Sequence, residues 1–443
     1  MPQLKVLISG GGIAGNALAF WLSKLGHTVT VVERFPSLRI SGLQIDLRGF
    51  GIEVLKRMGL DEAFRKHAAL EDGMNIVDDA GRRWAYFGAN KSGRGVQSFT
   101  SEYEIMRGDL TRIIYDVTNK ERVRYIFGTT IKSYTELDGV DGAGVEVLFA
   151  DGNKERFDLL VGADGIGSHV RKMMVLGTDA SDTGTEVTNR DDGYVPLKGV
   201  YIAYFTIPSE MKAGESYAAT SYATTKKRMI MLRRHNPHTI QVYMICETDN
   251  PRMRSIRRGD VEEEKKAFAE IFHGAKWRTE EFLKALETNE DWYLERVGLV
   301  QLDSWSRNGR VVLVGDAAHC PTASTGMGTS SAMIGAYILA GEIGRHCGRG
   351  DDGSRGEQHR VKDGLAMALK AYDDKFQPFM KRVQKGLSRD TGFWWMPVTW
   401  WSVLFARLLA AFIAFTRLNI VGEYFLSESV GDWKLPDYEE LRI

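Results

Sequence analysis

Two glycine-rich segments contain the residues best suited to binding a phosphorylated cofactor. The first, Gly10–Gly15, reads GGGIAG and fits the pattern G-x-G-x-x-G, and the second runs from Gly315-Asp316 to Gly328. Glycines at the first spacing permit a tight turn and let the backbone approach a pyrophosphate, whose charge is stabilised by free N–H groups where the next helix begins. Two such segments far apart in the sequence indicate a chain folded around one long cofactor.

The elements around the first segment can hold it in place. Leu4–Ser9 is an apolar run typical of a buried parallel strand, Asn16–Leu25 predicts a helix, and Thr28–Val32 predicts a second strand ending in Glu33. A carboxylate there accepts hydrogen bonds from both ribose hydroxyls and repels a 2′-phosphate, which favours FAD or NAD over NADP. A glycine turn that binds nothing is the alternative, and the motif alone does not distinguish FAD from NAD.

A third segment, Phe157–Gly165, is an apolar strand ending in Asp164-Gly165, with Ser168 and Arg171 after it. The three segments in this order resemble the single-component flavin monooxygenases of the p-hydroxybenzoate hydroxylase type, over residues 4–175 and 295–345. The resemblance implies an α/β protein. A Rossmann-like FAD-binding domain of the p-hydroxybenzoate hydroxylase fold would carry an inserted β-sheet substrate domain and a C-terminal helical segment.

The same resemblance implies a set of cofactor contacts. In the family, the aspartate that matches Asp316 holds the ribityl chain, and the loop that matches Pro321–Gly328 runs along the isoalloxazine ring. A helix that begins near Gly328 would stabilise negative charge on the reduced ring. The Asp-Gly element serves both FAD and NAD(P)H. The predicted cofactor-binding residues are Gly10, Gly12, Ile13, Ala14, Gly15, Glu33, Arg34, Asp46, Arg107, Asp164, Gly315, Asp316, Pro321, Gly326, Met327 and Gly328.

Three shorter segments, Ser41–Gly49, Glu104–Leu110 and Gly335–Glu342, resemble the tetracycline-inactivating monooxygenases and their polyketide-oxidising relatives. In those enzymes the arginine that matches Arg107 contacts FAD, and the aspartate that matches Asp46 lies near the flavin and the substrate. A surface arginine at a helix start remains the alternative for the first residue, and a structural ion pair with Arg48 for the second.

The chain departs from the family after Gly328, where the usual asparagine is replaced by Thr329-Ser330-Ser331. Flavin binding is expected to survive this change because much of the contact is made by backbone atoms.

These features predict an FAD-dependent monooxygenase that uses NAD(P)H and O₂. Through a flavin C4a-hydroperoxide it would hydroxylate, epoxidise or carry out Baeyer–Villiger oxidation of a bulky aromatic or polyketide-like small molecule. No catalytic side chain is required, since the cofactor carries the chemistry. The alternatives are a membrane-associated FAD-dependent reductase of the same fold and a non-catalytic flavin-binding protein. A flavin halogenase is disfavoured because the signature Trp-x-Trp-x-Ile-Pro is absent.

The expected domains alternate along the chain. Residues 1–72, 101–177 and 296–345 are assigned to the FAD-binding domain, residues 73–100 and 178–295 to the substrate domain, and residues 346–443 to a C-terminal helical region. Alternating strands in the second domain predict a sheet that covers the flavin. Four residues on these strands are candidates for binding the substrate, although each could instead face water at an edge or a turn: Tyr204, Arg233, His235 and Gln241.

The composition excludes several function classes. Basic and acidic residues balance at 58 each in 443 residues, so no electrostatic footprint for nucleic acid is present. Three scattered cysteines do not suggest a disulfide framework or a metal site. No signal peptide is predicted, because the first apolar run leads directly into Gly10, and we expect a cytoplasmic protein with no metal.

The C-terminal part has an aromatic segment with four tryptophans between residues 394 and 401. The leading interpretation of residues 393–421 is a helix that covers the mouth of the substrate site. An interface-lying segment in peripheral contact with a membrane is the second interpretation. A transmembrane helix is disfavoured because Pro397 and Arg407 interrupt the apolar run.

Overall fold

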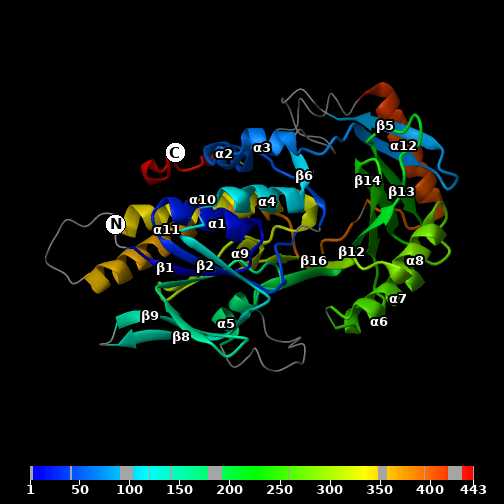
Figure 1. Cartoon of the computed structure of the whole chain (residues 1–443). Coiled ribbons are helices and arrows are strands. Elements are labelled where there is room, and N and C mark those ends of the chain that lie inside the picture. The colour runs from blue at the N-terminus through cyan, green and yellow to red at the C-terminus, as the bar shows by residue number, and fades with distance from the viewer. Residues whose placement is uncertain are drawn as a thin grey trace.

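The computed structural model describes residues 3–39, 42–89, 103–118, 120–139, 142–177, 192–257, 259–347, 357–393, 395–417 and 432–442. Its helices and strands form two halves, one built on a six-stranded sheet and the other on a seven-stranded sheet (Figure 1). This arrangement confirms the predicted mixed α/β fold.

The six-stranded sheet has the order β17-β18-β11-β1-β2-β7, and all its pairs are parallel except β17 with β18. Parallel strands covered on both faces are apolar throughout, and β1, β2, β11 and β18 are buried almost completely. The strands are β1 (Lys5–Ser9), β2 (Thr28–Glu33), β7 (Val123–Phe127), β11 (Leu159–Gly162), β17 (Ser306–Arg307) and β18 (Val311–Leu313).

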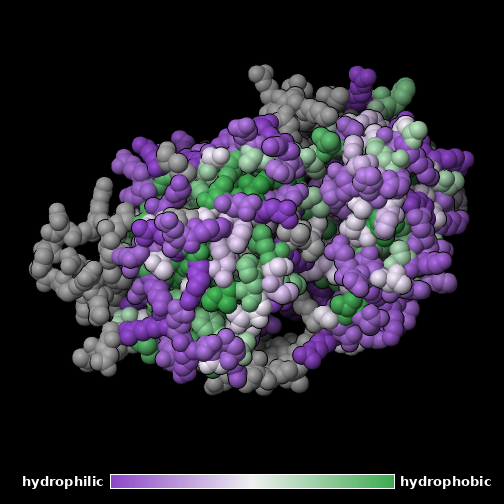
Figure 2. Space-filling view, in the orientation of Figure 1, coloured by the Kyte–Doolittle hydropathy of each residue, from purple (hydrophilic) through white to green (hydrophobic). Residues whose placement is uncertain are grey.

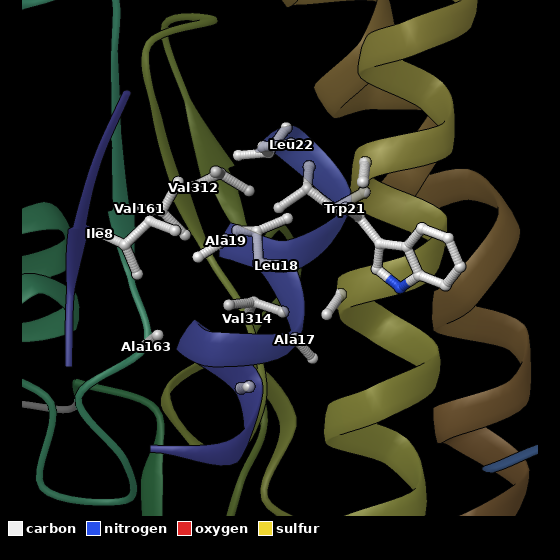
Figure 3. Close-up of a cluster of buried hydrophobic side chains, with 14 of the residues drawn as sticks. Ile8, Ala17, Leu18, Ala19, Trp21, Leu22, Val161, Ala163, Val312 and Val314 are labelled. Atoms are coloured by element: carbon white, nitrogen blue, oxygen red, sulfur yellow. The ribbon is translucent and has the colours of Figure 1, made fainter. Parts of the chain in front are cut away.

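Helices cover one face of this sheet, and a three-stranded sheet lies on the other (Figure 1). Figure 3 shows why α1 packs so closely, because its small and apolar side chains meet Ile8, Val161 and Val312 of three neighbouring strands. The elements are α1 (Ile13–Lys24), α2 (Phe50–Arg57), α3 (Asp61–Lys66), α4 (Arg107–Val117), α5 (His169–Leu176), α9 (Asp316–His319), α10 (Gly328–Cys347), α11 (Glu357–Val383), β8 (Ile131–Gly139), β9 (Gly142–Phe149) and β10 (Lys154–Phe157).

The seven-stranded sheet has the order β16-β12-β15-β14-β13-β4-β5. One of its faces is packed by three helices around Phe268, Phe272 and Phe282, which are fully buried. The elements are β4 (Gly73–Val77), β5 (Arg83–Gly88), β12 (Tyr194–Pro208), β13 (Ala219–Thr224), β14 (Arg228–Asn236), β15 (Thr239–Glu247), β16 (Tyr293–Val300), α6 (Pro251–Ser255), α7 (Val261–Phe272) and α8 (Thr279–Thr288).

Strands β3 (Gln44–Asp46) and β6 (Glu104–Met106) pair as a separate two-stranded ribbon. In the sequence, β3 precedes and β6 follows the strands β4 and β5 of the seven-stranded sheet. The predicted elements are found within a few residues, with two differences. Helix α1 begins three residues before the predicted start at Asn16. The alternating pattern of the sequence predicts a strand over Val200–Thr206, and β12 extends well beyond it. The predicted domain boundary after residue 295 falls inside β16, and the domain division itself stays a prediction.

The C-terminal part contains α12 (Trp400–Thr416), which packs against β5 and β13. Across the described ranges, no helix combines the length and the apolar character that crossing a membrane needs. After α12 in the sequence, residues 432–442 return to the half of the molecule that is built on the six-stranded sheet. Tyr438 is completely buried there, with its hydroxyl 2.5 Å from Glu342 Oε1 on α10. A Cβ at Gly341 would lie 2.3 Å from the Tyr438 ring, so this glycine makes the close packing possible.

We expect Tyr438→Ala to lower the free energy of unfolding by about 3 to 5 kcal/mol, because it opens a large cavity and removes a donor from buried Glu342. Tyr438→Phe keeps the ring and should cost only about 1 kcal/mol. Urea denaturation of both variants measures the two effects. Equal losses would contradict the packing role of the ring.

Candidate functional site

The glycine turn after β1 is held against the end of β11. Gly10 has a φ of +111°, and a Cβ there would lie 2.4 Å from the carbonyl oxygen of Ala163. A Cβ at Gly15 would lie 2.0 Å from the carbonyl oxygen of Gly10. These distances forbid any side chain, so the first and third predicted segments touch through backbone alone.

Glu33 stands at the end of β2, as predicted, and faces the same turn. Its Oε2 accepts a hydrogen bond of 2.8 Å from the backbone N–H of Gly11, and its Oε1 accepts one of 3.1 Å from Phe35. The carboxylate therefore lies beside the glycine turn, where the ribose of a bound dinucleotide is expected.

The second glycine-rich segment joins the same place. Gly315 has a φ of +65°, and a Cβ there would lie 2.7 Å from Cβ of Ala14 on α1. Asp316 follows as the first residue of α9. Burial raises the pKa of Asp316, while the nearby charges of Arg107 and Arg171 oppose that rise. All three predicted segments thus meet at the carboxyl ends of β1, β11 and β18.

Cations gather at this meeting point. Arg107 begins α4, and its Nη2 lies 3.7 Å from the position that a Cβ of Gly12 would take. Burial and the charge of Arg107 both lower the pKa of Arg39, whose guanidinium stacks on Phe35 and Tyr293 at 5.2 and 5.0 Å. Two mutually repelling guanidinium groups beside an open glycine turn indicate a site that an anion would stabilise.

Arg39 was missed from the sequence, although the basic residues that follow Glu33 could have suggested it. Arg34, which was predicted to bind the cofactor, is exposed and stacks on Phe35 at 5.0 Å. It lies at the same strand end as Glu33, and its contact with the cofactor stays a prediction.

The carboxylate of Asp164 is used within the protein. It accepts hydrogen bonds from the Ser168 hydroxyl at 2.5 Å and from the backbone N–H groups of His169 and Val170 at 2.7 and 3.2 Å. These contacts satisfy free donors where α5 begins. In this geometry the Asp164 carboxylate has a structural role. Its contact with the cofactor stays a prediction.

Arg171 connects the third segment to the second. Its side chain is almost fully buried and donates hydrogen bonds to the carbonyl oxygens of Ile166 and Ala317, at 2.7 and 3.2 Å. It also forms an ion pair with Asp192 at 3.0 Å. A buried arginine with these partners fixes the start of α9 relative to α5.

The loop before α10 lies against the β3–β6 ribbon. Gly326 has a φ of +63°, and a Cβ there would lie 3.2 Å from Cζ of Arg48. Arg48 forms an ion pair with Asp46, which is the structural role left open above, and the pair lies beside this loop. Among the described residues outside its own turn of helix, no atom lies within 4 Å of the position that a Cβ of Gly328 would take. The first residue of α10 therefore faces open space.

The serines that replace the family's asparagine are engaged in the fold. Ser330 is fully buried, and its hydroxyl accepts a hydrogen bond of 2.8 Å from the backbone N–H of Arg48. Ser331 donates to the carbonyl oxygen of Gly328 at 3.0 Å. The substitution thus ties α10 to Arg48, two residues after β3, and occupies the carbonyl oxygen of Gly328.

These residues fit an FAD molecule. One continuous region of the fold is lined by the glycine turn and by the two guanidinium groups that repel each other. The carboxylate at the end of β2 and the accessible first residue of α10 line the same region. Glu33 would hold the ribose, Arg107 and Gly12 the pyrophosphate, Asp316 the ribityl chain, and residues 326–328 the ring. The roles of these single residues stay predictions.

Three of the four candidate substrate residues share one face of the seven-stranded sheet. The registers Tyr204↔Tyr243, Thr206↔Gln241 and Arg233↔Gln241 place Tyr204, Gln241 and Arg233 on the face opposite to the helices α6–α8. Leu387, Phe393 and Met396 of the chain's C-terminal part pack against this face. We call it the inner face of the sheet.

The alternative that Arg233 faces water is wrong. Its side chain is 13% exposed and lies 3.2 Å from Glu71 and 3.6 Å from Glu104. The reason is that β14 lies between β13 and β15 and is not an edge strand. His235 is half-buried near the end of β14, with its ring 3.1 Å from Nε2 of Gln241, and burial lowers its pKa.

Arg233 belongs to a buried polar cluster that sequence reasoning missed. Nε2 of Gln44 donates to Oε2 of Glu71 at 3.0 Å and to Oε2 of Glu104. Two buried carboxylates and one guanidinium leave an excess of negative charge. Burial, opposed by Arg233 and reinforced by Glu104, raises the pKa of Glu71 to about 7. The four side chains come from four separate segments, so no local pattern could have revealed the cluster.

A cavity of about 420 Å³ is lined by Gly193, residues 300–303, Trp305, His319, residues of α11 and Gln384. None of the predicted cofactor or substrate residues lines it. Burial lowers the pKa of His319 to about 3, so its imidazole is neutral, and its ring packs on Trp305 at 4.8 Å. We assign this cavity no part in the site.

Comparisons with known proteins agree with the geometry. A family model described as FAD binding domain matches residues 3–353. The chain is 50% identical to the FAD-dependent monooxygenase asL4 of Sarocladium schorii, over 100% of this chain and 99% of that protein. It is 38% identical to the flavin-dependent monooxygenase eupH of a Phoma species, over 95% and 94% of the two chains. The crystal structure of the tetracycline destructase Tet(51) matches with a TM-score of 0.71 and 25% identity, over 99% of this chain and 100% of that one.

We expect Asp316→Ala to weaken FAD binding about 10-fold or more, the cost of losing a hydrogen bond to a charged group. Titration of the flavin-free protein with FAD, followed by fluorescence, measures the dissociation constant. Asp151→Ala, on an exposed turn, is the matched control. An unchanged constant for Asp316→Ala would remove the role assigned to this carboxylate.

Because the pKa of Glu71 is raised in the fold, the stability of the protein should depend on pH. The unfolded chain loses this proton near pH 4.5 and the folded chain near pH 7, so its contribution to stability is present below 4.5 and is lost as the pH rises to 7. Glu71→Gln imitates the protonated acid. Its melting temperature should match that of the wild type at low pH and exceed it by about 2 °C or more above pH 7.

Glu62→Gln, at an exposed position of α3, is the control for removing a carboxylate. Melting curves of the three proteins across the pH range provide the test. A difference between Glu71→Gln and the wild type that does not change with pH would show that Glu71 does not retain a proton in the fold.

Proposed function

We propose that this protein uses NAD(P)H and O₂ to oxygenate a bulky aromatic or polyketide-like small molecule. The premise is its family: the chain belongs to the FAD binding domain family and is an FAD-dependent monooxygenase. The observation that carries the proposal is the meeting of three distant segments beside Arg39 and Arg107, next to a broad sheet face. The name of one structural relative, tetracycline destructase, supports a large, oxygen-rich substrate.

Each part of the chain has a task in this proposal. Residues 1–72, 101–177 and 296–345 form the FAD-binding domain, and residues 73–100 and 178–295 form the substrate domain. In the C-terminal region, α11 and residues 432–442 pack on the FAD-binding half, whereas Phe393, Met396 and α12 pack on the substrate sheet. Bound FAD supplies electron storage and the activation of O₂. The N-terminus of α10 beside Gly328 stabilises negative charge on the ring, because free N–H groups gather where a helix begins.

The inner face of the sheet binds the substrate. Tyr204 and Tyr243 present aromatic rings at 5.2 Å from each other, and Gln241 accepts a hydrogen bond of 2.9 Å from the Tyr243 hydroxyl. These groups suit a flat, polar aromatic molecule. Arg233 also lies on this face, where the carboxyl groups of Glu71 and Glu104 outweigh its positive charge. Phe393 and Met396 cover part of the face and exclude water, which would otherwise waste reducing equivalents.

The nicotinamide binds elsewhere than the glycine turn. The turn at Gly10–Gly15 follows β1 and opens α1, as a dinucleotide-binding turn requires, and it is assigned to FAD. NAD(P)H is therefore a transient co-substrate, and either NADH or NADPH is compatible with the proposal. Hydroxylation, epoxidation and Baeyer–Villiger oxidation are all compatible outcomes.

We further propose that the C-terminal aromatic segment makes peripheral contact with a membrane. The observation that supports this contact is the exposure of the apolar side chains of α12. Membrane contact is compatible with the monooxygenase and also with a reductase of the same fold, so the reaction itself must be tested.

The test is isotopic. The purified holoenzyme is supplied with NADH or NADPH, ¹⁸O₂ and a panel of aromatic polyketides and tetracyclines, and products are analysed by mass spectrometry. One ¹⁸O atom per product molecule is expected, with none gained from H₂¹⁸O under ordinary O₂. A reduced product without new oxygen would favour the reductase, and NAD(P)H that never reduces bound flavin would favour a binding protein.

A further inference from the structure

Helix α12 is strongly apolar, with Arg407 as its one charged residue, but it is hardly buried. Among its 17 residues only Val403 is buried. A helix of this composition normally lies inside a protein or a membrane. Its outward side chains are 45–67% exposed, and that of Phe415 is 88% exposed. This set, which we call the outer face of α12, consists of Trp401, Phe405, Leu408, Leu409, Phe412 and Phe415.

The opposite side of α12 is firmly attached to the protein. Arg407 donates a hydrogen bond of 2.7 Å to Asp79, which also forms an ion pair with Lys276 at 3.3 Å. Thr399 and Ser402 close the N-terminus with a reciprocal capping box. The single charge inside the helix is thus turned inward, and the outer face is a fixed apolar surface.

The segment that carries this surface has charges of one sign only. The sequence from Thr391 to Arg417 contains no acidic residue. Arg417 is exposed directly after the helix, and exposed Lys226 lies at the other end, where its backbone N–H donates to Val398 at 2.8 Å. An apolar face with a cation at each end complements a bilayer surface that carries anionic headgroups.

A second copy of the chain complements this surface less well. A symmetric pair would bring the same patch together from both copies. Parallel or antiparallel, the helices would then place the cations at Lys226 and Arg417 against cations, with no acidic residue of the segment to balance them. Like charges opposite each other are unfavourable.

The outer face is also unusual for this molecule. The side that Figure 2 presents is largely hydrophilic, with hydrophobic residues in small groups. A row of large apolar side chains along a whole helix exceeds the scattered exposure of an ordinary surface. The row begins close to the inner face of the sheet, because Met396 packs there only four residues before α12 begins.

We propose that the outer face of α12 docks on a lipid surface with anionic headgroups, in the plane of the membrane, which gives the peripheral contact proposed above its site and its lipid class. Aromatic and aliphatic side chains enter the region between headgroups and acyl chains. Lys226 and Arg417 meet phosphate or carboxylate groups of the lipids. The substrate side of the enzyme then lies close to the lipid surface.

The experiment is flotation of the holoenzyme with vesicles of phosphatidylcholine alone or with about one third phosphatidylserine. The wild type should float with the mixed vesicles, and added salt should weaken its binding. Phe405→Ser combined with Phe412→Ser should reduce the bound fraction about 10-fold or more, because two apolar anchors are lost. Val261→Ser combined with Met367→Ser removes exposed apolar side chains elsewhere and should float like the wild type.

Failure of the wild type to float, or equal flotation of the Phe405/Phe412 variant, would overturn the proposal. So would a wild-type dimer that this variant converts to a monomer in light scattering, since the face would then be a self-interface. Flavin content and product oxygenation are measured on the same samples. A protein that floats but does not oxygenate would overturn the proposed reaction and leave the docking site intact.

Discussion

The approach of Gly10 to the end of β11 is the contact on which the cofactor site depends. A Cβ at Gly10 would lie 2.4 Å from the carbonyl oxygen of Ala163, so the turn and the strand end can meet only as bare backbone. A Cβ at Gly315 would lie 2.7 Å from Cβ of Ala14, so this glycine also permits a close approach. Because these contacts leave no space for side chains, the carboxyl ends of three parallel strands form an edge that a pyrophosphate can reach.

The other parts of the site follow from this edge. Arg107 and Arg39 supply positive charge to it, and Arg171 fixes the start of α9 by donating to Ala317. The β3–β6 ribbon then extends the site toward the second sheet, where Gln44 contacts both Glu71 and Glu104 beside Arg233. A buried polar cluster, in which burial raises the pKa of Glu71, therefore connects the cofactor half to the substrate half.

The sequence predicts the parts of the fold that local rules determine. The G-x-G-x-x-G turn, Glu33 and the Gly315-Asp316 segment are found together, because parallel strands place their carboxyl ends at one edge. Arg233 illustrates where local reasoning fails. Its strand looks like an edge strand until β13 and β15 are known to flank it, and Glu71 and Glu104 approach it from distant segments. Arg39 was missed for the same reason, since only the fold brings it beside Arg107.

The central claim is that one FAD molecule binds along the three joined segments. The most direct measurement is the visible spectrum and flavin content of the purified chain, before and after incubation with excess FAD and removal of free ligand. The account predicts a yellow protein with about one FAD per chain, as expected for a single pyrophosphate turn. A chain that stays colourless under these conditions would contradict it.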